Sequence, residues 1–522
     1  MTPAAFDPAP ATEPAQEARG LPEPPLGAGI PRREFLKATA GLTAAVLAGP
    51  EPLRAAAPAA MPPPVGIQVG AVSFVDEGID PVLEVFQAQG AVNTILLAAF
   101  TYGRGLAGRQ IPGQPFPDHG AQESDAPFFH GGNYALPRPE FYRDTVLKQT
   151  RAPDFGSRDI LAEVLPKAKQ RGFRVLCCCE DQWRPDVPGF DQVAEVDLYG
   201  RRAGTLCLFN PDVCHFWTGL VTDYCRSYDV DGILFFNERN GPLLSALGAS
   251  HFQSIASSRV TCFCPHHQAA AREHGVDFER AREGYRRLDR FVQQALAQKR
   301  PSDGYFVEFW RLLAEYPEIL LWDKLFEVGK HRVLAEVHQA VKAIRPSLEV
   351  GFHLEHVNSF NPIFRATRRY EDLATKADFL KVVVYNNCGG ERYAQFIRNV
   401  QATVFGDVPA DELLQFNNHL LNYTREAGLA ELPAAGLSPD YVARETRRAL
   451  AGVRGQCRIF PGIDIGIPTG PRSRKASPDD TADAVRAALA AGANGVIFSR
   501  KYSEMCLANL AAAGRAVRGA RA

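Results

Sequence analysis

The 522-residue sequence has no surplus of charge of either sign. It contains 58 Lys and Arg residues against 59 Asp and Glu residues, which gives a formal net charge of -1 at pH 7. Its basic clusters, RETRR (444–448) and PRSRK (471–475), are short, and acidic residues elsewhere balance them. A protein that binds nucleic acid usually collects a basic surplus on one face, so the composition argues against a nucleic-acid partner.

Two further features are missing. No apolar run reaches the length of about 20 residues that a transmembrane helix needs. No glycine-rich dinucleotide fingerprint follows the first predicted strand, because GAVSFVDEG (70–78) lacks the required spacing. We therefore expect no stable membrane insertion, and we favour a closed barrel over an open sheet that binds a dinucleotide.

The N-terminus contains a recognisable pattern. Residues 1–30 are rich in Pro and Ala without periodicity, and RREFLK (32–37) then precedes a short, weakly apolar stretch. The six residues resemble the twin-arginine export signal: two arginines, any residue, Phe, Leu and Lys. This resemblance implies a periplasmic or otherwise exported protein, with cleavage after Ala57 or Ala59. We interpret residues 1–60 as signal peptide and leader, and exclude them from the fold.

Cysteine is absent before residue 177, and all 11 cysteines lie between residues 177 and 506. This spacing is not that of a small disulfide scaffold. The consecutive Cys177, Cys178 and Cys179 lie in an apolar run, so we expect them to pack as small buried hydrophobes. Export to an oxidising compartment leaves one or two disulfides open, and their pairing cannot be deduced from the sequence.

From residue 66 onward, short apolar runs alternate with amphipathic helical patterns. Strands are predicted at 66–74, 92–99, 173–180, 231–238, 348–355, 379–386, 457–464 and 494–500. Alternating strands and helices predict a parallel sheet, and eight such units predict a single (β/α)8 TIM barrel over residues 61–522, of class α/β. Long insertions at 101–157, 239–324 and 387–438 each follow a strand, on the face where such barrels bind substrates.

Polar residues gather where the predicted strands end. Alternation along LEVGFHLEH (348–356) puts His353 and Glu355 on one face, and Asp464 ends the seventh strand. We therefore expect the carboxylates of Glu238, Glu355 and Asp464 to meet at the barrel mouth and to be catalytic. The residues expected to bind substrate around them are Glu180, Asn237, Arg239, His353, Tyr385, Asn386, Arg500 and Lys501.

Two or three carboxyl groups in one barrel mouth are typical of glycosidic bond cleavage. One protonated carboxyl donates a proton to the leaving oxygen, while an ionised one attacks the anomeric carbon or activates water. This chemistry needs no cofactor.

The segment LCLFNPDVCHFWTGLVTDYCRSYDVDGILFFNERNG (206–241) resembles glycoside-hydrolase-like (β/α)8 proteins, in which the fourth strand begins with DG and ends in a catalytic Glu. In the large clan of retaining glycosidases that Glu follows an Asn, as Glu238 follows Asn237. The resemblance implies an exported glycosidase acting on an oligosaccharide or glycoside. The clan places a Glu on the seventh strand, where this chain has Asp464. Amylase-like enzymes instead use the fourth, fifth and seventh strands, and Glu238, Glu355 and Asp464 occupy those places.

A second segment, VTCFCPHHQAAAREHGVD (260–277), resembles the CxCxxC metal loop of β-galactosidase-like members, with His267 in place of the last Cys. The resemblance implies a structural Zn held by Cys262, Cys264 and His267. Cys207, Cys214 or His266 can supply a fourth ligand.

Two other functions fit the same barrel. A metal-dependent sugar isomerase, epimerase or lyase would hold Mn or Mg through Glu180, Glu238, His353 and Glu355, with Lys381 or Lys501 carrying a proton. A non-catalytic carbohydrate-binding barrel would bind sugars without turnover. The effects of a chelator and of Glu238→Gln on activity distinguish these functions from a glycosidase.

Overall fold

A computed structural model describes residues 62–521 except 111–113, 126–127, 250–258 and 471–472. The twin-arginine motif and the leader lie outside the described residues. In the described part, no helix is both long enough and apolar enough to cross a membrane.

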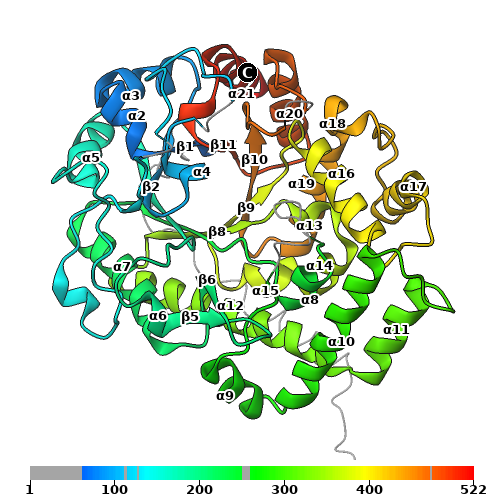
Figure 1. Cartoon of the computed structure of the whole chain (residues 1–522). Coiled ribbons are helices and arrows are strands. Elements are labelled where there is room, and N and C mark those ends of the chain that lie inside the picture. The colour runs from blue at the N-terminus through cyan, green and yellow to red at the C-terminus, as the bar shows by residue number, and fades with distance from the viewer. Residues whose placement is uncertain (1–61, 111–113, 126–127, 250–258, 471–472, 522) are drawn as a thin grey trace, which may run out of the picture. The chain divides into compact units, whose positions relative to one another are not determined.

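Eight parallel strands form a closed barrel with helices around it (Figure 1). Each strand pairs with the next one in the chain, and β1 pairs with both β2 and β11, which closes the sheet. The barrel strands are β1 (Val65–Val69), β2 (Thr94–Thr101), β4 (Arg174–Glu180), β7 (Gly232–Phe236), β8 (Glu349–Leu354), β9 (Phe379–Val383), β10 (Arg458–Asp464) and β11 (Val496–Ser499). The predicted (β/α)8 barrel is confirmed.

Amphipathic helices cover the outside of the barrel. Several begin with the expected side-chain caps: Asp159 accepts a hydrogen bond from the Ala162 N–H, and Ser477 forms a capping box with Asp480. The helices that alternate with the strands are α3 (Ile79–Ala88), α5 (Ile160–Gln170), α7 (Pro211–Ser227), α12 (Glu318–Ile344), α16 (Gly389–Gln401), α19 (Pro439–Val453), α20 (Pro478–Ala490) and α21 (Leu507–Arg521).

The first predicted strand is too long. The strand ends at Val69, and residues Ala71–Asp76 form a short helix, α2, instead. Four residues of α2 are buried, so the apolar run in the sequence extends from the strand β1 into the helix α2. An unbroken apolar run cannot by itself distinguish a strand from a buried helix.

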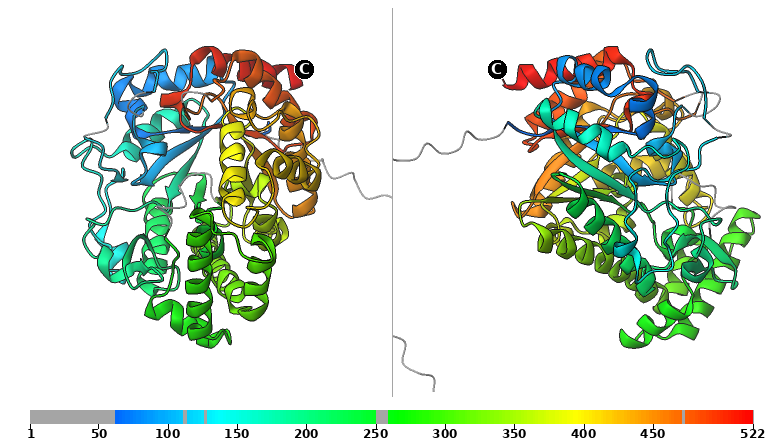
Figure 2. Two further views of the ribbon diagram at one scale, coloured as in Figure 1. Left: turned by 45° about the vertical axis from the view of Figure 1, so that its right-hand side comes forward. Right: turned by 90° about the vertical axis from the view of Figure 1, so that its left-hand side faces the viewer.

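The second insertion forms a helical layer that projects beyond the barrel (Figure 2). It contains α8 (Pro242–Ala246), α9 (Pro265–Glu273), α10 (Phe278–Leu296) and α11 (Tyr305–Glu315). Phe263 stacks on Trp322 at 5.2 Å between ring centroids, and both rings belong to the core beneath these helices. The layer therefore has its own apolar packing.

The other segments after the barrel strands contain mostly short elements. They include α4 (Arg104–Ala107), β3 (Gly132–Asn133), which pairs antiparallel with β2, and the hairpin β5 (Ala194–Val196) and β6 (Arg202–Leu206). After β8 and β9 come α13 (Val357–Phe360), α14 (Pro362–Thr367), α15 (Tyr370–Ala374), α17 (Ala410–Leu421) and α18 (Leu432–Ala435).

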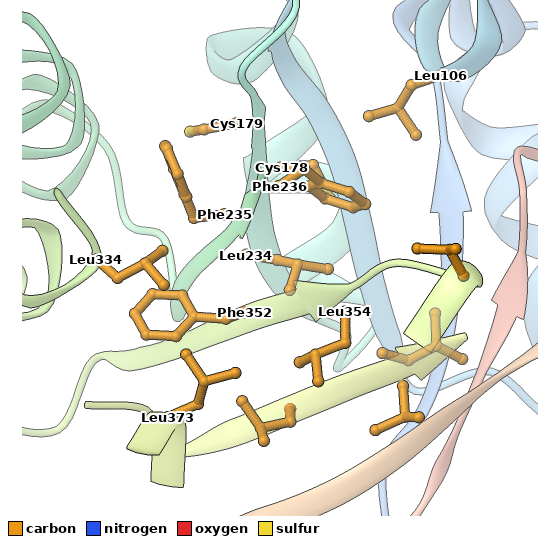
Figure 3. Packing of buried hydrophobic residues seen from close by; sticks show 14 of the residues in the cluster. Leu106, Cys178, Cys179, Leu234, Phe235, Phe236, Leu334, Phe352, Leu354 and Leu373 are labelled. Carbon is orange, nitrogen blue, oxygen red and sulfur yellow. The ribbon is translucent and has the colours of Figure 1, made fainter. Parts of the chain in front are cut away.

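Side chains of β7 alternate between the inside and the outside of the barrel (Figure 3). Phe235 points outward toward Leu334 of α12 and Leu373 of α15, whereas Leu234 and Phe236 point inward. This alternation holds only within a strand, so it does not predict which way a side chain points once the strand has ended.

A repeated contact joins the strands at the end of the barrel opposite the mouth. Four neighbouring pairs of barrel strands share the same contact. The side chain of an Asn or Asp that lies one or two residues ahead of the second strand accepts a hydrogen bond from a backbone N–H at the start of the first strand. We call these contacts the base clasps. The pairs are Asn93 with Val65 at 2.8 Å, Asp231 with Val175 at 2.6 Å, Asp378 with Val350 at 2.7 Å, and Asn494 with Ile459 at 2.8 Å. They join β1 to β2, β4 to β7, β8 to β9 and β10 to β11.

Candidate active site

An open cavity lies inside the barrel mouth, and its empty volume of about 490 Å³ includes space that is open to solvent. Seven of the eight barrel strands, or the segments that follow them, contribute to its lining, so it lies where a TIM barrel carries its chemistry. The lining residues are Gln68, Gly105, Leu106, Glu180, Phe236, Glu238, His353, Lys381, Tyr385, Arg392 and Arg500. We call this cavity the mouth cavity.

Glu238 follows β7 and is held by the neighbouring strand. Its Oε1 lies 2.5 Å from Nε2 of His353, and its side chain is 26% exposed. The His353 ring stacks on Phe236 at 4.5 Å between centroids. Burial lowers the pKa of His353, so the neutral ring donates its Nε2–H to the Glu238 carboxylate.

Glu180 ends β4 and is held from β2. The hydroxyl of Thr101 donates to Glu180 Oε2, and the Gly103 N–H donates to that hydroxyl oxygen at 2.8 Å. A Cβ on Gly103 would lie 2.6 Å from Glu180 Oε2, so this carboxyl position depends on a residue without a side chain.

The two carboxyl groups of the mouth cavity have opposite pKa shifts. Burial, together with the charge of Glu238, raises the pKa of Glu180 to about 7. Burial also acts to raise the pKa of Glu238, but the charge that His353 carries when protonated, its hydrogen bond, and the charges of Arg392 and of protonated Lys381 outweigh burial and lower this pKa to about 2. Near pH 7 the cavity therefore holds one ionised carboxylate and one carboxyl that can still carry a proton.

Glu355 does not reach the mouth cavity. Strand β8 ends at Leu354, so the alternation that predicted an inward side chain stops one residue too early. The Glu355 carboxylate instead accepts hydrogen bonds from Lys330 Nζ and Arg368 Nη1, each at 2.6 Å, in a cluster between the barrel and α12. Its side chain is 3% exposed, and these two cations lower its pKa against the effect of burial.

Asp464 is also bonded elsewhere. Its carboxylate accepts hydrogen bonds from the backbone N–H groups of Gly466, Ile467 and Cys388, at 2.8 to 2.9 Å. Asp464 is fully buried and does not line the mouth cavity. Its contacts fix the turn after β10 and the start of α16.

Asn237 and Arg239 turn away from the mouth cavity on either side of Glu238. Asn237 donates to Asp181 at 2.9 Å, and Arg239 donates to the Leu206 carbonyl at 2.7 Å and forms an ion pair with Glu195. In the structure these contacts of Asn237 and Arg239 fix the segment carrying Glu238.

The predicted residues of the sixth and eighth strands divide between the mouth cavity and its surroundings. Tyr385 and Arg500 line the cavity, and Arg500 forms a two-pronged ion pair with Glu504. Asn386 is buried and does not line the cavity. Lys501 is buried and donates to three backbone carbonyls in the loop after β2, at 2.8 to 2.9 Å.

Three polar residues that line the cavity were not among the residues predicted at strand ends, although Lys381 was named as a proton carrier of the metal-dependent alternative. Gln68 is the fourth residue of β1, Lys381 lies in the middle of β9, and Arg392 lies in α16. Gln68 and Lys381 are polar residues inside apolar strands, which is a signal that the sequence does contain. Arg392 is one of many helix arginines, and nothing in its sequence neighbourhood marks it.

Three cysteines form a separate cluster beside the fourth strand. The sulfur atoms of Cys207, Cys262 and Cys264 lie within 4.8 Å of one another and all three residues are buried. Hydrogen bonds with Cys207 and Cys262 lower the pKa of the Cys264 thiol, whereas the pKa values of the buried Cys207 and Cys262 thiols are raised. The close spacing of three sulfur atoms fits a soft metal such as Zn.

The remaining residues proposed for this metal lie at different distances. The ring of His267 is outside the close group, although its buried Nε2 has no hydrogen-bond partner among the described residues. Cys214 lies beside Glu336 instead. In the described part of the chain, Glu180, Glu238, His353 and Glu355 do not form such a close group, so the ligand set of the metal-dependent alternative is not assembled.

No protein-family model and no curated protein sequence matches the chain. Among solved structures, it is similar to α-L-fucosidase isoenzyme 2 from Paenibacillus thiaminolyticus, with 13% identity over 88% of this chain and 49% of that one, at a TM-score of 0.45. The glycoside hydrolase domain of PgaB (BpsB) from Bordetella bronchiseptica matches at 11% identity over 84% of this chain and 94% of that one, with a TM-score of 0.45.

A β-galactosidase from the haloarchaeon Halorubrum lacusprofundi matches at 12% identity, over 88% of this chain and 58% of that one, with a TM-score of 0.49. The chain thus spans about half the length of the fucosidase and somewhat more of the β-galactosidase. Its barrel has a distant structural resemblance to glycoside hydrolases.

Proposed function

We propose that the chain is an exported glycoside hydrolase whose catalytic pair is Glu180 and Glu238. The observation that carries this proposal is that two carboxyl groups in one cavity have pKa values moved in opposite directions, to about 7 and about 2. Carboxyl pairs with separated pKa values are how glycosidases obtain an acid and a base, or an acid and a nucleophile, at one pH.

In this mechanism Glu180 is the general acid. Its proton passes to the glycosidic oxygen as the bond to the anomeric carbon breaks, and Glu180 becomes a carboxylate. The Thr101 hydroxyl donates to Oε2 of Glu180, which leaves Oε1 to carry the proton. Glu238, ionised and held by His353, attacks the anomeric carbon or takes a proton from the attacking water.

Glu355 and Asp464 have no catalytic part in this proposal. Their carboxylates are bonded to two cations and to three backbone N–H groups respectively, outside the cavity. We assign them to holding the segments after the fifth and seventh barrel strands.

The test is a screen of aryl glycosides and of plant and bacterial oligosaccharides with the wild type, Glu180→Gln and Glu238→Gln. We expect turnover by the wild type and its loss in Glu238→Gln. With an aryl glycoside whose leaving group needs no proton, Glu180→Gln should retain much of the activity. Proton NMR of the first product then shows whether the anomeric configuration is retained or inverted. No turnover of any substrate by the wild type would contradict the proposal.

Two further assignments accompany this function. We infer export from the twin-arginine pattern, and fractionation of cells expressing the wild type or Arg32→Lys with Arg33→Lys tests it. We also infer a structural Zn on Cys207, Cys262 and Cys264, with His267, whose buried Nε2 has no hydrogen-bond partner among the described residues, as the candidate for a fourth ligand. The metal would tie the β6 end to the loop after β7 and would take no part in hydrolysis.

A further inference from the structure

Lys381 is a buried amine that the proposed hydrolysis does not use. It lies in the middle of β9 and is fully buried, yet it lines the mouth cavity. Space for its side chain comes from the next strand, because a Cβ on Gly462 would lie 2.9 Å from Lys381 Cε and 3.2 Å from the Tyr385 ring. The barrel is therefore built to accommodate this lysine.

The partners of Lys381 are neutral. Its Nζ donates to Gln68 Oε1 and to the Tyr385 hydroxyl at 3.0 Å, and it lies 5.4 Å from the centre of the Phe236 ring. Within the described residues, no carboxylate is within ion-pairing distance of this Nζ. Burial in such surroundings disfavours the ammonium form.

The other buried lysines differ in this respect. Lys330 is paired with the Glu355 carboxylate, and Lys501 donates to three carbonyls, an arrangement that needs all three N–H bonds of an ammonium group. Lys381 has two hydrogen-bond partners. The Gln68 side-chain oxygen can only accept, whereas the Tyr385 hydroxyl can also rotate and donate to a neutral amine. A neutral amine fits this site, and burial lowers the pKa of Lys381 to about 7.

We propose that Lys381 acts as an amine nucleophile that forms an imine with the carbonyl carbon of a small polyhydroxylated aldehyde or ketone, such as an open-chain sugar. The cavity has room for such a molecule, and Tyr385, Arg392 and the carboxyl groups offer polar contacts around the amine. This activity goes beyond glycosidic hydrolysis and does not depend on it.

The step balances within the cavity. The neutral Nζ adds to the carbonyl carbon, and one amine proton moves to the carbonyl oxygen to give a carbinolamine. Glu180 then gives a proton to that hydroxyl, which leaves as water, and a protonated imine remains. The negative charge of Glu238 favours the cationic form of Lys381, and it should favour the positively charged imine nitrogen in the same way.

Reductive trapping tests the proposal. Protein is incubated with D-glyceraldehyde, D-xylose or pyruvate in the presence of sodium cyanoborohydride, and the adducts are located by peptide mass mapping. We expect one saturable adduct per chain on Lys381 with the two sugars, no adduct on Lys330 or Lys501, and a rate that is greatest near pH 7, where Lys381 can be neutral while Glu180 still carries a proton. Lys381→Met should lose this adduct and keep only the slow, unsaturable labelling of surface lysines.

The outcomes separate this activity from hydrolysis. A wild type that hydrolyses a glycoside but gives no adduct on Lys381 would overturn this inference and leave the proposed function intact, and an adduct on Lys381 in a wild type without hydrolysis would do the reverse. Adducts spread over surface lysines, with none enriched at Lys381 in the wild type, would overturn the proposal. An adduct with pyruvate alone would overturn the assignment to polyhydroxylated carbonyls. The wild-type peptide map decides these points even if Lys381→Met does not fold.

Discussion

Nε2 of His353 lies 2.5 Å from Oε1 of Glu238, so the fifth barrel strand holds the carboxylate that follows the fourth. The imidazole is itself fixed by stacking on Phe236, the last residue of the fourth strand. The His353 ring thus orients Glu238, and Phe236, two residues before Glu238, in turn positions the ring. This arrangement fixes both the position and the ionisation of Glu238.

Replacing His353 should move the acidic limb of the pH profile. In His353→Phe a ring still packs on Phe236, but Glu238 loses its hydrogen bond and its pKa rises from about 2 toward the ordinary value of 4.5. Because Glu238 must be ionised, kcat/KM should then fall off at a higher pH than in the wild type. His353→Gln, which keeps an N–H donor, is the matched control and should shift less. An acidic limb unmoved in both variants would contradict this role of His353.

Glu180 should make the protein less stable as the pH rises. Its folded-state pKa of about 7 lies above the ordinary value of 4.5, so the folded state binds the proton more tightly than the unfolded state does. The stability that this proton contributes is present below about pH 4.5 and is lost as the pH rises through 7. Glu180→Gln should remove this dependence and gain roughly 1 to 3 kcal/mol relative to the wild type at pH 8. Urea unfolding at pH 5 and pH 8 measures the difference.

Glu355→Gln should affect folding rather than chemistry. The change leaves Lys330 and Arg368 buried without their shared carboxylate, which is expected to cost about 3 kcal/mol in the free energy of unfolding. Thermal unfolding measures this loss, and activity per folded molecule should stay near that of the wild type. Loss of turnover in a fully folded Glu355→Gln would instead restore Glu355 to the catalytic machinery.

The cysteine cluster should carry metal in the purified protein. We expect about one Zn per chain by elemental analysis, and a lower melting temperature after chelation, because a structural metal contributes to folding. Cys264→Ser should lose the metal, whereas Cys225→Ser, a buried cysteine outside the cluster, should keep it. Stoichiometric metal in Cys264→Ser would contradict the assignment.

The barrel could be predicted from the sequence because each strand is a short apolar run bounded by an amphipathic helix. That pattern depends only on local periodicity, and it placed all eight strands within a few residues of their positions. The error at 66–74 arose where a buried helix, α2, continued the apolar run of β1. Periodicity does not record a change of conformation in a segment that is buried on all sides.

The site was only partly predictable. Glu180, Glu238 and His353, which line one cavity, were predicted to lie together because they stand at strand ends, but the sequence could not show that β8 stops at Leu354 and turns Glu355 outward. Nor could it show that the three backbone N–H groups around Asp464 occupy its oxygens. Whether a carboxylate works or merely holds a turn depends on its partners, which come from distant segments.

The base clasps also bear on how the sequence of this barrel can evolve. Each clasp joins two consecutive strands, so the eight strands form four pairs, and the register of each pair is fixed at the end opposite the mouth cavity. A cavity that contains Glu180, Glu238 and Lys381 weakens the sheet around it, because buried charges are costly. With the register fixed at the far end, the residues of the mouth can be exchanged for those of another reaction while the strands keep their alignment.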